Sequence, residues 1–287
     1  MADRVAGDVV RYGKVDREYG VKLFTTPPED DGPIWMVNLM SYREKADYAD
    51  GRESNVTGRE ADDLYAPLGP LKEIGAEVVL VADVDTQFFG SEPKWDRIGV
   101  VKYPTRRSFI EMQNRSDFKE LHKHKDAGMS QTIVMGCLPM PVPALPADAP
   151  GWDAVPHPST PDDDYVVVIH VLKFKDDERR EHMATYTDHA GLVAVPNGVR
   201  LAAWTKVEGT ILGDGRQWDQ VRFNVFPSRA AFMAVALDPA RLKAQSEHRE
   251  TAIADTYTMI TRPTIDRISE SITGQPADYP AKGGRRK

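Results

Sequence analysis

Short apolar runs recur along this chain in one order, and the same order then returns. In the first half, four runs rich in β-branched and aromatic residues predict strands. They span 34–42, 77–85, 98–103 and 132–137. Helices are expected over 61–75 and 108–127. Pro67 and Pro70 interrupt the first helix, and the second breaks near Arg115.

The pattern restarts after residue 164. Strands are expected over 165–174, 199–207, 221–226 and 257–261, and helices over 176–191, 229–236 and 240–254. In both halves the order is β-α-β-β-α-β, which is the ferredoxin-like arrangement. The sequence therefore predicts an α+β protein made of two tandem ferredoxin-like repeats.

One segment occurs twice without a gap. Lys94–Phe109 reads KWDRIGVVKYPTRRSF, and Gln217–Phe232 reads QWDQVRFNVFPSRAAF. Each copy has the pattern of a turn, an alternating strand, a proline-containing turn and a helix start. A repeat of this length indicates architecture better than a single motif does. We expect Asp96 and Asp219 to fix the turn through hydrogen bonds to the backbone.

Proline density indicates the domain boundary. Residues 138–164 carry eight of the chain's 21 prolines, which favours a stiff, extended connection. The expected division is an N-terminal arm (1–32), a first repeat (33–138), a linker (139–163), a second repeat (164–263) and a C-terminal tail (264–287). We expect the arm to pack across the body or serve a partner subunit, and the tail from Pro263 onward to be peripheral.

A ferredoxin-like unit places both helices on one face of its sheet, so the other apolar face needs a partner. Two such units in one chain can cover each other's sheets. We therefore expect an intramolecular α/β barrel in which the sheets face each other, with a ligand cavity between them.

The W-D strand, the Y/F-P-[ST]-R turn and the following helix resemble the dimeric α/β-barrel superfamily, particularly its small members of unassigned function. The resemblance covers about 33–138 and 164–263, and it implies that the dimer is fused into one chain. The superfamily includes cofactor-independent monooxygenases, muconolactone-type isomerases, polyketide-cyclase-like proteins and haem-binding enzymes, so it indicates the fold more than the reaction. Such units commonly associate, which leaves a further homodimer open.

Composition narrows the partners and the compartment. The net charge of −7 argues against nucleic acid or an anionic membrane as the main partner. Cys137 is the only cysteine and lies in an apolar run, so it is expected to be a buried, inert thiol. The chain shows neither a signal-peptide pattern nor a membrane-spanning run, which predicts a cytoplasmic protein. Dinucleotide, Walker, serine-hydrolase and zincin motifs are lacking, and we expect no cofactor.

Two polar residues stand within strands of large apolar residues. Asn38 lies in M-V-N-L-M and His170 in V-I-H-V-L, and the repeats align them. A polar group at such a place is costly unless it is hydrogen-bonded, so either it is satisfied locally or it faces a cavity. In a cavity, His170 could act as a general base and Asn38 could orient a carbonyl or oxyanion.

Further candidates come from the regions in which the halves differ. The proposed catalytic set is His170, Asn38, Tyr65, Asp188 and His189, and the proposed substrate-binding set is Arg59, Tyr186, His124, His248 and Trp204. His122 and His124, two residues apart on a helix, point in different directions and do not suggest a shared metal.

These features favour a cofactor-independent enzyme of lyase or isomerase type. It would act on a small apolar or aromatic carbonyl compound by general acid–base catalysis in the inter-sheet cavity. One alternative is a cofactor-free monooxygenase acting on an aromatic substrate, which oxygen uptake would reveal. Another is a small-molecule-binding protein without turnover. A haem-dependent variant would need an axial ligand in the cavity and would show a Soret band.

Overall fold

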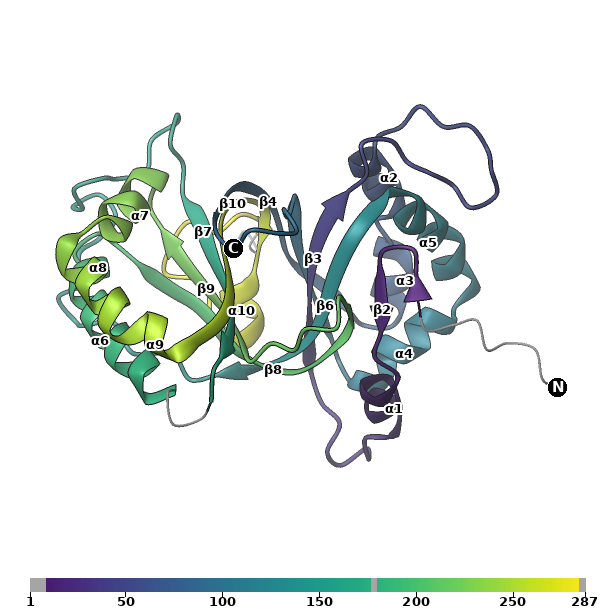
Figure 1. Ribbon diagram of the computed structural model, residues 1–287, viewed down its shortest axis with the longest axis horizontal. Coiled ribbons are helices and arrows are strands. Elements are labelled where there is room, and N and C mark those ends of the chain that lie inside the picture. The colour runs from purple at the N-terminus through teal and green to yellow at the C-terminus, as the bar shows by residue number, and fades with distance from the viewer. Residues whose placement is uncertain (1–8, 177–179, 284–287) are drawn as a thin grey trace. The chain divides into compact units, whose positions relative to one another are not determined.

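The computed structural model describes residues 9–176 and 180–283 (Figure 1). The chain forms two compact units. The first unit consists of the described residues up to Val81 together with Glu92–Leu138 and Val207–Gln217. The second unit consists of Ala82–Ser91, Pro139–Lys206 and the described residues from Trp218 onward.

The elements follow the predicted order. The strands of the first half are β1 (Val9–Val10), β2 (Gly13–Val15), β3 (Ile34–Tyr42), β4 (Glu77–Phe89), β5 (Arg97–Tyr103) and β6 (Met129–Met140). Its helices are α1 (Arg17–Thr25), α2 (Gly58–Tyr65), α3 (Leu68–Glu73), α4 (Arg106–Asn114) and α5 (Ser116–Gly128). The strands of the second half are β7 (Val166–Phe174), β8 (Arg200–Gly213), β9 (Gln220–Phe226) and β10 (Ile253–Asp266). Its helices are α6 (Arg180–Ala194), α7 (Arg229–Ala236), α8 (Pro239–Ala244), the π-helix η1 (Gln245–Arg249), α9 (Glu250–Ala252) and α10 (Ile268–Thr273).

Both halves have the strand order of a ferredoxin-like sheet. The first half runs β6-β3-β5-β4 and the second half β10-β7-β9-β8. The α+β class is thus confirmed. That the sheets of the two halves face each other as a barrel stays a prediction.

β4 and β8 extend beyond their predicted ends, and each passes from one unit into the other. β4 belongs to the second unit from Ala82 onward, and β8 belongs to the first unit from Val207 onward. The added part of β8 pairs with β2, where Lys14 lies opposite Gly213. The strands are longer than their apolar runs because neighbouring strands supply hydrogen bonds to the polar extensions.

The pleat of β7 decides which side chains face the helices. Val166 and Val168 pack with residues of α7, and Leu172 and Phe174 pack with residues of α6 and α8. Successive residues of a strand point to opposite faces, so His170 lies on this same helix-facing side. Helices α6 to α9 cover that face of the sheet in Figure 1.

The N-terminal arm is more ordered than its weak periodicity indicates. It contains β1, β2 and α1, and the side chain of Asp16 caps α1 by accepting a hydrogen bond from the backbone N–H of Tyr19. Only Tyr19 and Leu23 of α1 are buried, which explains the faint pattern. The helix packs against α4 of the first unit.

The prediction of a peripheral C-terminal tail is wrong. Ile268 and Tyr279 are buried, and both Tyr165 and Tyr279 direct their hydroxyl groups to the buried carboxyl of Asp266. Burial raises the pKa of Asp266 to about 6. The tail therefore forms part of the second unit's core.

The two copies of the repeated segment make the same contacts. Asp96 Oδ2 accepts a hydrogen bond from the backbone N–H of Tyr42 at 2.7 Å, and Asp219 Oδ2 accepts one from Phe174 at the same distance. The expected side-chain to backbone bonds are confirmed, although they reach the first strand of each half instead of the turn itself. Each carboxylate thus ties the third strand to the first.

A second pair of aspartates caps the helix that follows the repeated turn. Asp163 accepts hydrogen bonds from the N–H groups of Arg229 and Ala230 at the start of α7, each at 3.0 Å. Asp31 does the same for Arg106 and Arg107 of α4. Carboxylates at a helix N-terminus satisfy free N–H groups and complement the helix dipole.

We predict that Asp163→Ala lowers the free energy of unfolding by about 1–2 kcal/mol, because two helix N–H groups lose their acceptor. Asp162→Ala is the matched control, since Asp162 is an exposed carboxylate one residue earlier. The control should stay within ~0.5 kcal/mol of the wild type. Urea unfolding at neutral pH measures both, and equal stability of the two variants would contradict the capping role.

Candidate functional site

The second unit encloses a cavity of about 540 Å³ between its sheet and its helices. β7, β8 and β9 form the floor, α6, α7, α8 and η1 form the walls, and Pro143–Pro146 of the linker closes part of the rim. Its place differs from the sequence expectation, which put the cavity between two sheets. A space of this size suits a small ligand.

Four side chains from adjacent strands form a row across the sheet. His170 of β7 lies opposite Thr258 of β10 on one side and opposite Arg222 of β9 on the other. Arg222 in turn lies opposite Trp204 of β8. Directly opposed residues share one face of a sheet, so the row presents a hydroxyl, an imidazole, a guanidinium and an indole to the helix side. His170, Arg222 and Trp204 line the cavity.

His170 is held by one hydrogen bond and is half-buried in the lining of the cavity. Its Nδ1 lies 3.1 Å from Thr258 Oγ1, and Nε2 has no hydrogen-bond partner within the described part of the chain. Burial lowers the pKa of His170 well below its ordinary value, and the nearby Arg249, Arg222 and Arg241 lower the pKa further. The imidazole is therefore neutral at physiological pH.

Three arginines reach the cavity from different elements. Arg222 comes from β9, Arg241 from α8 and Arg249 from η1, and all three are buried. The π-helical turn η1 alters the usual helical register at its last residue, Arg249. Single π-helical turns often occur at functional sites.

Neutral oxygens accept the hydrogen bonds of these arginines. Arg222 donates to Gln220 Oε1 at 2.8 and 3.0 Å and to Thr187 Oγ1 at 3.2 Å. The Arg222 guanidinium carbon lies 4.0 Å from the ring centre of Trp204. Burial lowers the pKa of Arg222 to about 10, so the group stays charged near neutrality.

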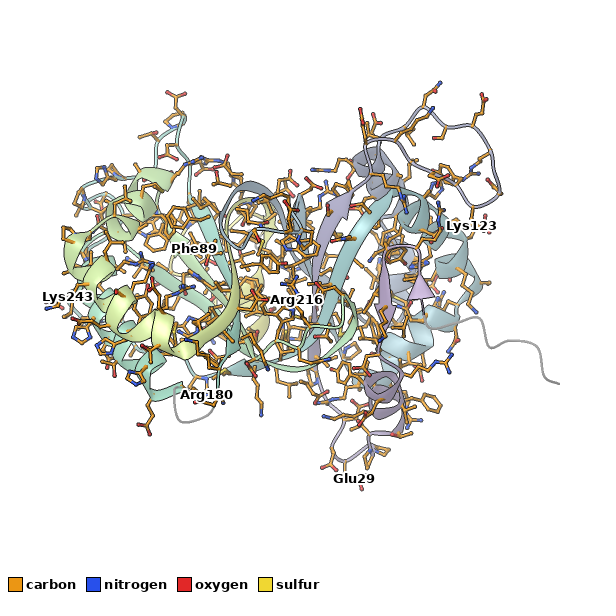
Figure 2. The ribbon with its side chains drawn as sticks, viewed as in Figure 1. Glu29, Phe89, Lys123, Arg180, Arg216 and Lys243 are labelled. Atoms are coloured by element: carbon orange, nitrogen blue, oxygen red, sulfur yellow. The ribbon has the colours of Figure 1, made fainter. Side chains whose placement is uncertain are left out.

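Arg241 and Arg249, the two arginines on helical segments, also donate hydrogen bonds to neutral oxygens. Arg241 donates to the hydroxyl of Tyr186 at 3.1 Å and to the carbonyl oxygen of Ala236 at 3.0 Å. Arg249 donates to Thr256 Oγ1 at 3.2 Å and lies 5.1 Å from the ring centre of Phe89, which is labelled in Figure 2.

The cavity brings together four of the residues selected from the sequence. His170, Tyr186, Asp188 and Trp204 line it. Asp188 is exposed, whereas Tyr186 and Trp204 are buried. His189 and His248 lie outside the lining, and their rings stack on each other with centres 5.6 Å apart.

The other selected residues belong to the first unit. Asn38 occupies the position in β3 that His170 has in β7, since it lies opposite Gly99, the repeat counterpart of Arg222. The amide nitrogen of Asn38 donates to the carbonyl oxygen of Met36 at 3.0 Å.

The remaining three residues surround α2 and α5 of that unit. Tyr65 packs edge-on against His122, with ring centres 5.9 Å apart. His124 Nδ1 lies 2.7 Å from the hydroxyl of Tyr48. Arg59 lies 3.8 Å from the carboxylate of Asp63. These contacts place the three residues in a packed region that does not border the cavity of the second unit.

Several cavity residues were missed by the sequence reasoning. They are Arg222, Asn224, Arg241 and Arg249. Asn224 Oδ1 accepts a hydrogen bond from Trp204 Nε1 at 3.0 Å. A signal was present for two of them, because the repeat aligns Gly99 with Arg222 and Val101 with Asn224.

Residues 9–176 and 180–283 contain neither a metal-type cluster nor a membrane-spanning helix. No cluster of three or more His, Cys, Asp or Glu side chains there has an arrangement suited to a metal ion. None of the helices in the same ranges is long and apolar enough to cross a membrane.

No family model matches this chain, and no curated protein matches it. The similar solved structures include a protein of unknown function from Rhodopseudomonas palustris, with 26% identity, coverage of 46% of this chain and 98% of that one, and a TM-score of 0.39. An anthrone oxidase-like protein has 14% identity, coverage of 82% and 94%, and a TM-score of 0.47. A chlorite dismutase variant from Candidatus Nitrospira defluvii has 14% identity, coverage of 88% and 98%, and a TM-score of 0.44.

The chain resembles the dimeric α/β-barrel superfamily in fold. The β-α-β-β-α-β order of both halves and their strand order are those that the sequence resemblance implies.

The lowered pKa of His170 predicts a pH dependence of stability. In the unfolded chain a histidine takes up a proton below pH ~6.5, whereas folded His170 stays neutral to lower pH. The unfolded state then binds more protons, so the free energy of unfolding falls as the pH drops below ~6.5. A single such group contributes up to ~1.4 kcal/mol per pH unit.

We therefore expect His170→Gln to flatten this dependence by up to ~1.4 kcal/mol per pH unit between pH ~5 and ~6.5. Urea unfolding at a series of pH values gives the slope, which does not depend on the absolute stability of the variant. Burial also lowers the pKa of His122 to about 4, so part of the wild-type slope should remain. A slope identical to that of the wild type would rule out a neutral, buried His170.

Proposed function

We propose that this protein is a small-molecule enzyme whose site is the cavity of the second unit. We base this proposal on His170, which lines a cavity of about 540 Å³. Its imidazole is neutral, and its Nε2 has no hydrogen-bond partner among the described residues. A neutral imidazole in a cavity can accept a proton from a bound compound. The thioether, aliphatic and aromatic side chains around it favour an apolar or aromatic ligand body.

The reaction that these groups support is proton abstraction next to a carbonyl. His170 Nε2 would accept the proton, and the bond electrons would pass to the carbonyl oxygen as an enolate. N–H donors that line the cavity, such as the half-buried amide of Asn224 and the buried guanidinium of Arg222, could stabilise that oxyanion. Returning the proton to a different carbon gives an isomerase, and loss of a group from the neighbouring carbon gives a lyase.

The proposal retains two other parts of the sequence interpretation. The two halves are taken as tandem copies of one ferredoxin-like unit, supported by the equivalent contacts of Asp96 and Asp219. The first copy is taken as structural. Its Asn38 uses its amide on a neighbouring carbonyl oxygen and has Gly99 opposite it where the second copy has Arg222.

Proton abstraction can be measured without the natural substrate. We expect the protein to accelerate exchange of the α-protons of 2-tetralone in D₂O, followed by proton NMR. His170→Gln should lower the enzyme-catalysed exchange rate by about 100-fold or more, because general base catalysis contributes on that order. His157→Gln is the matched control, since His157 is exposed in the linker and remote from the lining of the cavity.

Other outcomes identify the alternatives. Exchange equal to that in buffer, for the wild type, would contradict the proposal. Oxygen uptake with a naphthol, without exchange, would favour a cofactor-free monooxygenase. A Soret band in the purified protein that shifts in His170→Gln would indicate haem bound at this residue.

A further inference from the structure

The buried arginines of this protein fall into two groups. The described residues include six of them: Arg97, Arg106, Arg200, Arg222, Arg241 and Arg249. The first three pair with carboxylates: Arg97 with Asp62 at 2.9 Å, Arg106 with Glu208 at 2.6 Å, and Arg200 with Asp278 at 3.2 Å. The last three form no ion pair with any described carboxylate, and these three line the cavity.

The two groups of arginines differ in how their positive charge is compensated. A buried charge is costly unless it is paired, and the first group follows that rule. In the second group, hydroxyl, amide and carbonyl oxygens accept hydrogen bonds but bring no negative charge. Water in the cavity would hydrate the guanidinium groups and would likewise bring no countercharge.

The three cations act on a common region. Arg249 lowers the pKa of Arg222, and Arg241 lowers the pKa of Arg249, after the larger effect of burial. All three lower the pKa of His170. Two carboxylates lie nearby, but Asp188 and Glu250 are both exposed. Of these, Glu250 raises the pKa of Arg249, and its exposure to solvent limits this effect, so the positive charge of the cavity is offset only in part.

N–H groups remain available for a ligand. A guanidinium has five N–H donors, and the contacts of Arg241 and Arg249 occupy two and one of them. Planar guanidinium groups bind carboxylates through two parallel hydrogen bonds. Phe226 on the floor of the same cavity, together with Phe232 and Val235 on its α7 wall, offers apolar contacts for the rest of a ligand.

We propose that Arg222, Arg241 and Arg249 form a carboxylate-binding subsite, so that the substrate is a small aromatic or aliphatic acid that also carries a carbonyl group. This inference deepens the proposed function and rests on the same cavity. The carboxylate supplies the missing countercharge, and the apolar body occupies the space beside His170.

Two probes of equal shape test the subsite. 2-Naphthoate and 2-naphthamide differ in charge and share a ring system, so their affinities for the wild-type protein isolate the carboxylate. By titration calorimetry at low salt, we expect 2-naphthoate to bind at least tenfold more tightly than 2-naphthamide. Raising the salt concentration should reduce this preference only in part, because the charges are buried. Equal affinities, or failure of 2-naphthoate to bind at millimolar concentration, would overturn the proposal.

Single substitutions test whether the arginines cause the preference for 2-naphthoate over 2-naphthamide. Arg249→Gln and Arg222→Gln should each reduce 2-naphthoate affinity by about tenfold or more and leave 2-naphthamide affinity within about threefold. Lys243→Gln is the matched control, since it removes one positive charge from α8, where Lys243 points away from the sheet into solvent (Figure 2). A loss in the control equal to that in the arginine variants would reduce the effect to general charge and overturn the subsite.

A measurement on the wild-type protein alone tests the subsite even if the variants fail to fold. 2-Naphthoate should raise the thermal unfolding temperature, and 2-naphthamide should raise it less at the same concentration. The two proposals also fail separately. Selective 2-naphthoate binding without any α-proton exchange retains the subsite and removes the enzyme. Exchange that requires His170 and persists undiminished in Arg249→Gln, for 2-tetralone and its 6-carboxy derivative alike, retains the enzyme and removes the subsite.

Discussion

The site depends on the register of β7 with its two neighbours. His170 faces Thr258 and Arg222 only because these residues are directly opposed, and a slip of one residue would move His170 to the other face of the sheet. Side-chain hydrogen bonds to the backbone of β7 hold this register on the sides of both neighbouring strands. Asp219 bonds the N–H of Phe174, and Thr261 donates to the carbonyl oxygen of Val167 at 2.7 Å. Structural bonds at the strand ends thus position the polar residue at its centre.

The same framework gives a different result in the first half. Asn38 lies opposite Gly99, and a side chain at Gly99 would approach Met40 to 3.3 Å. Aromatic side chains such as Phe109 and Phe118 pack against the helix-facing side of that sheet. Identical register therefore supports a packed core in one half and, in the other, a largely apolar cavity with polar residues on its floor. The difference lies in which side chains the equivalent positions carry.

The sequence predicted what periodicity and repetition encode. Each of the eight main strands overlaps the range predicted for it, because both repeats carry the apolar pattern of a strand at these places. The extensions of β4 and β8 and the packing of the tail could not be predicted, because they depend on neighbours distant in the sequence. Arg241 and Arg249 were missed for a related reason: a helical arginine has the pattern of a solvated residue until tertiary packing buries it. Arg222 could have been selected from the sequence, because it replaces Gly99 in the aligned repeat.

The arginines and the histidine act on each other, and in the proposed function this coupling would favour the reaction only when an acid is bound. Without a ligand, burial and three nearby positive charges hold the pKa of His170 well down, which keeps it neutral and makes it a weak base. A bound carboxylate offsets part of that positive potential and thereby makes protonation of His170 easier. In the proposed complex His170 would thus become a stronger base when a substrate proton lies within its reach. A neutral compound of the same shape would fill the cavity without this gain.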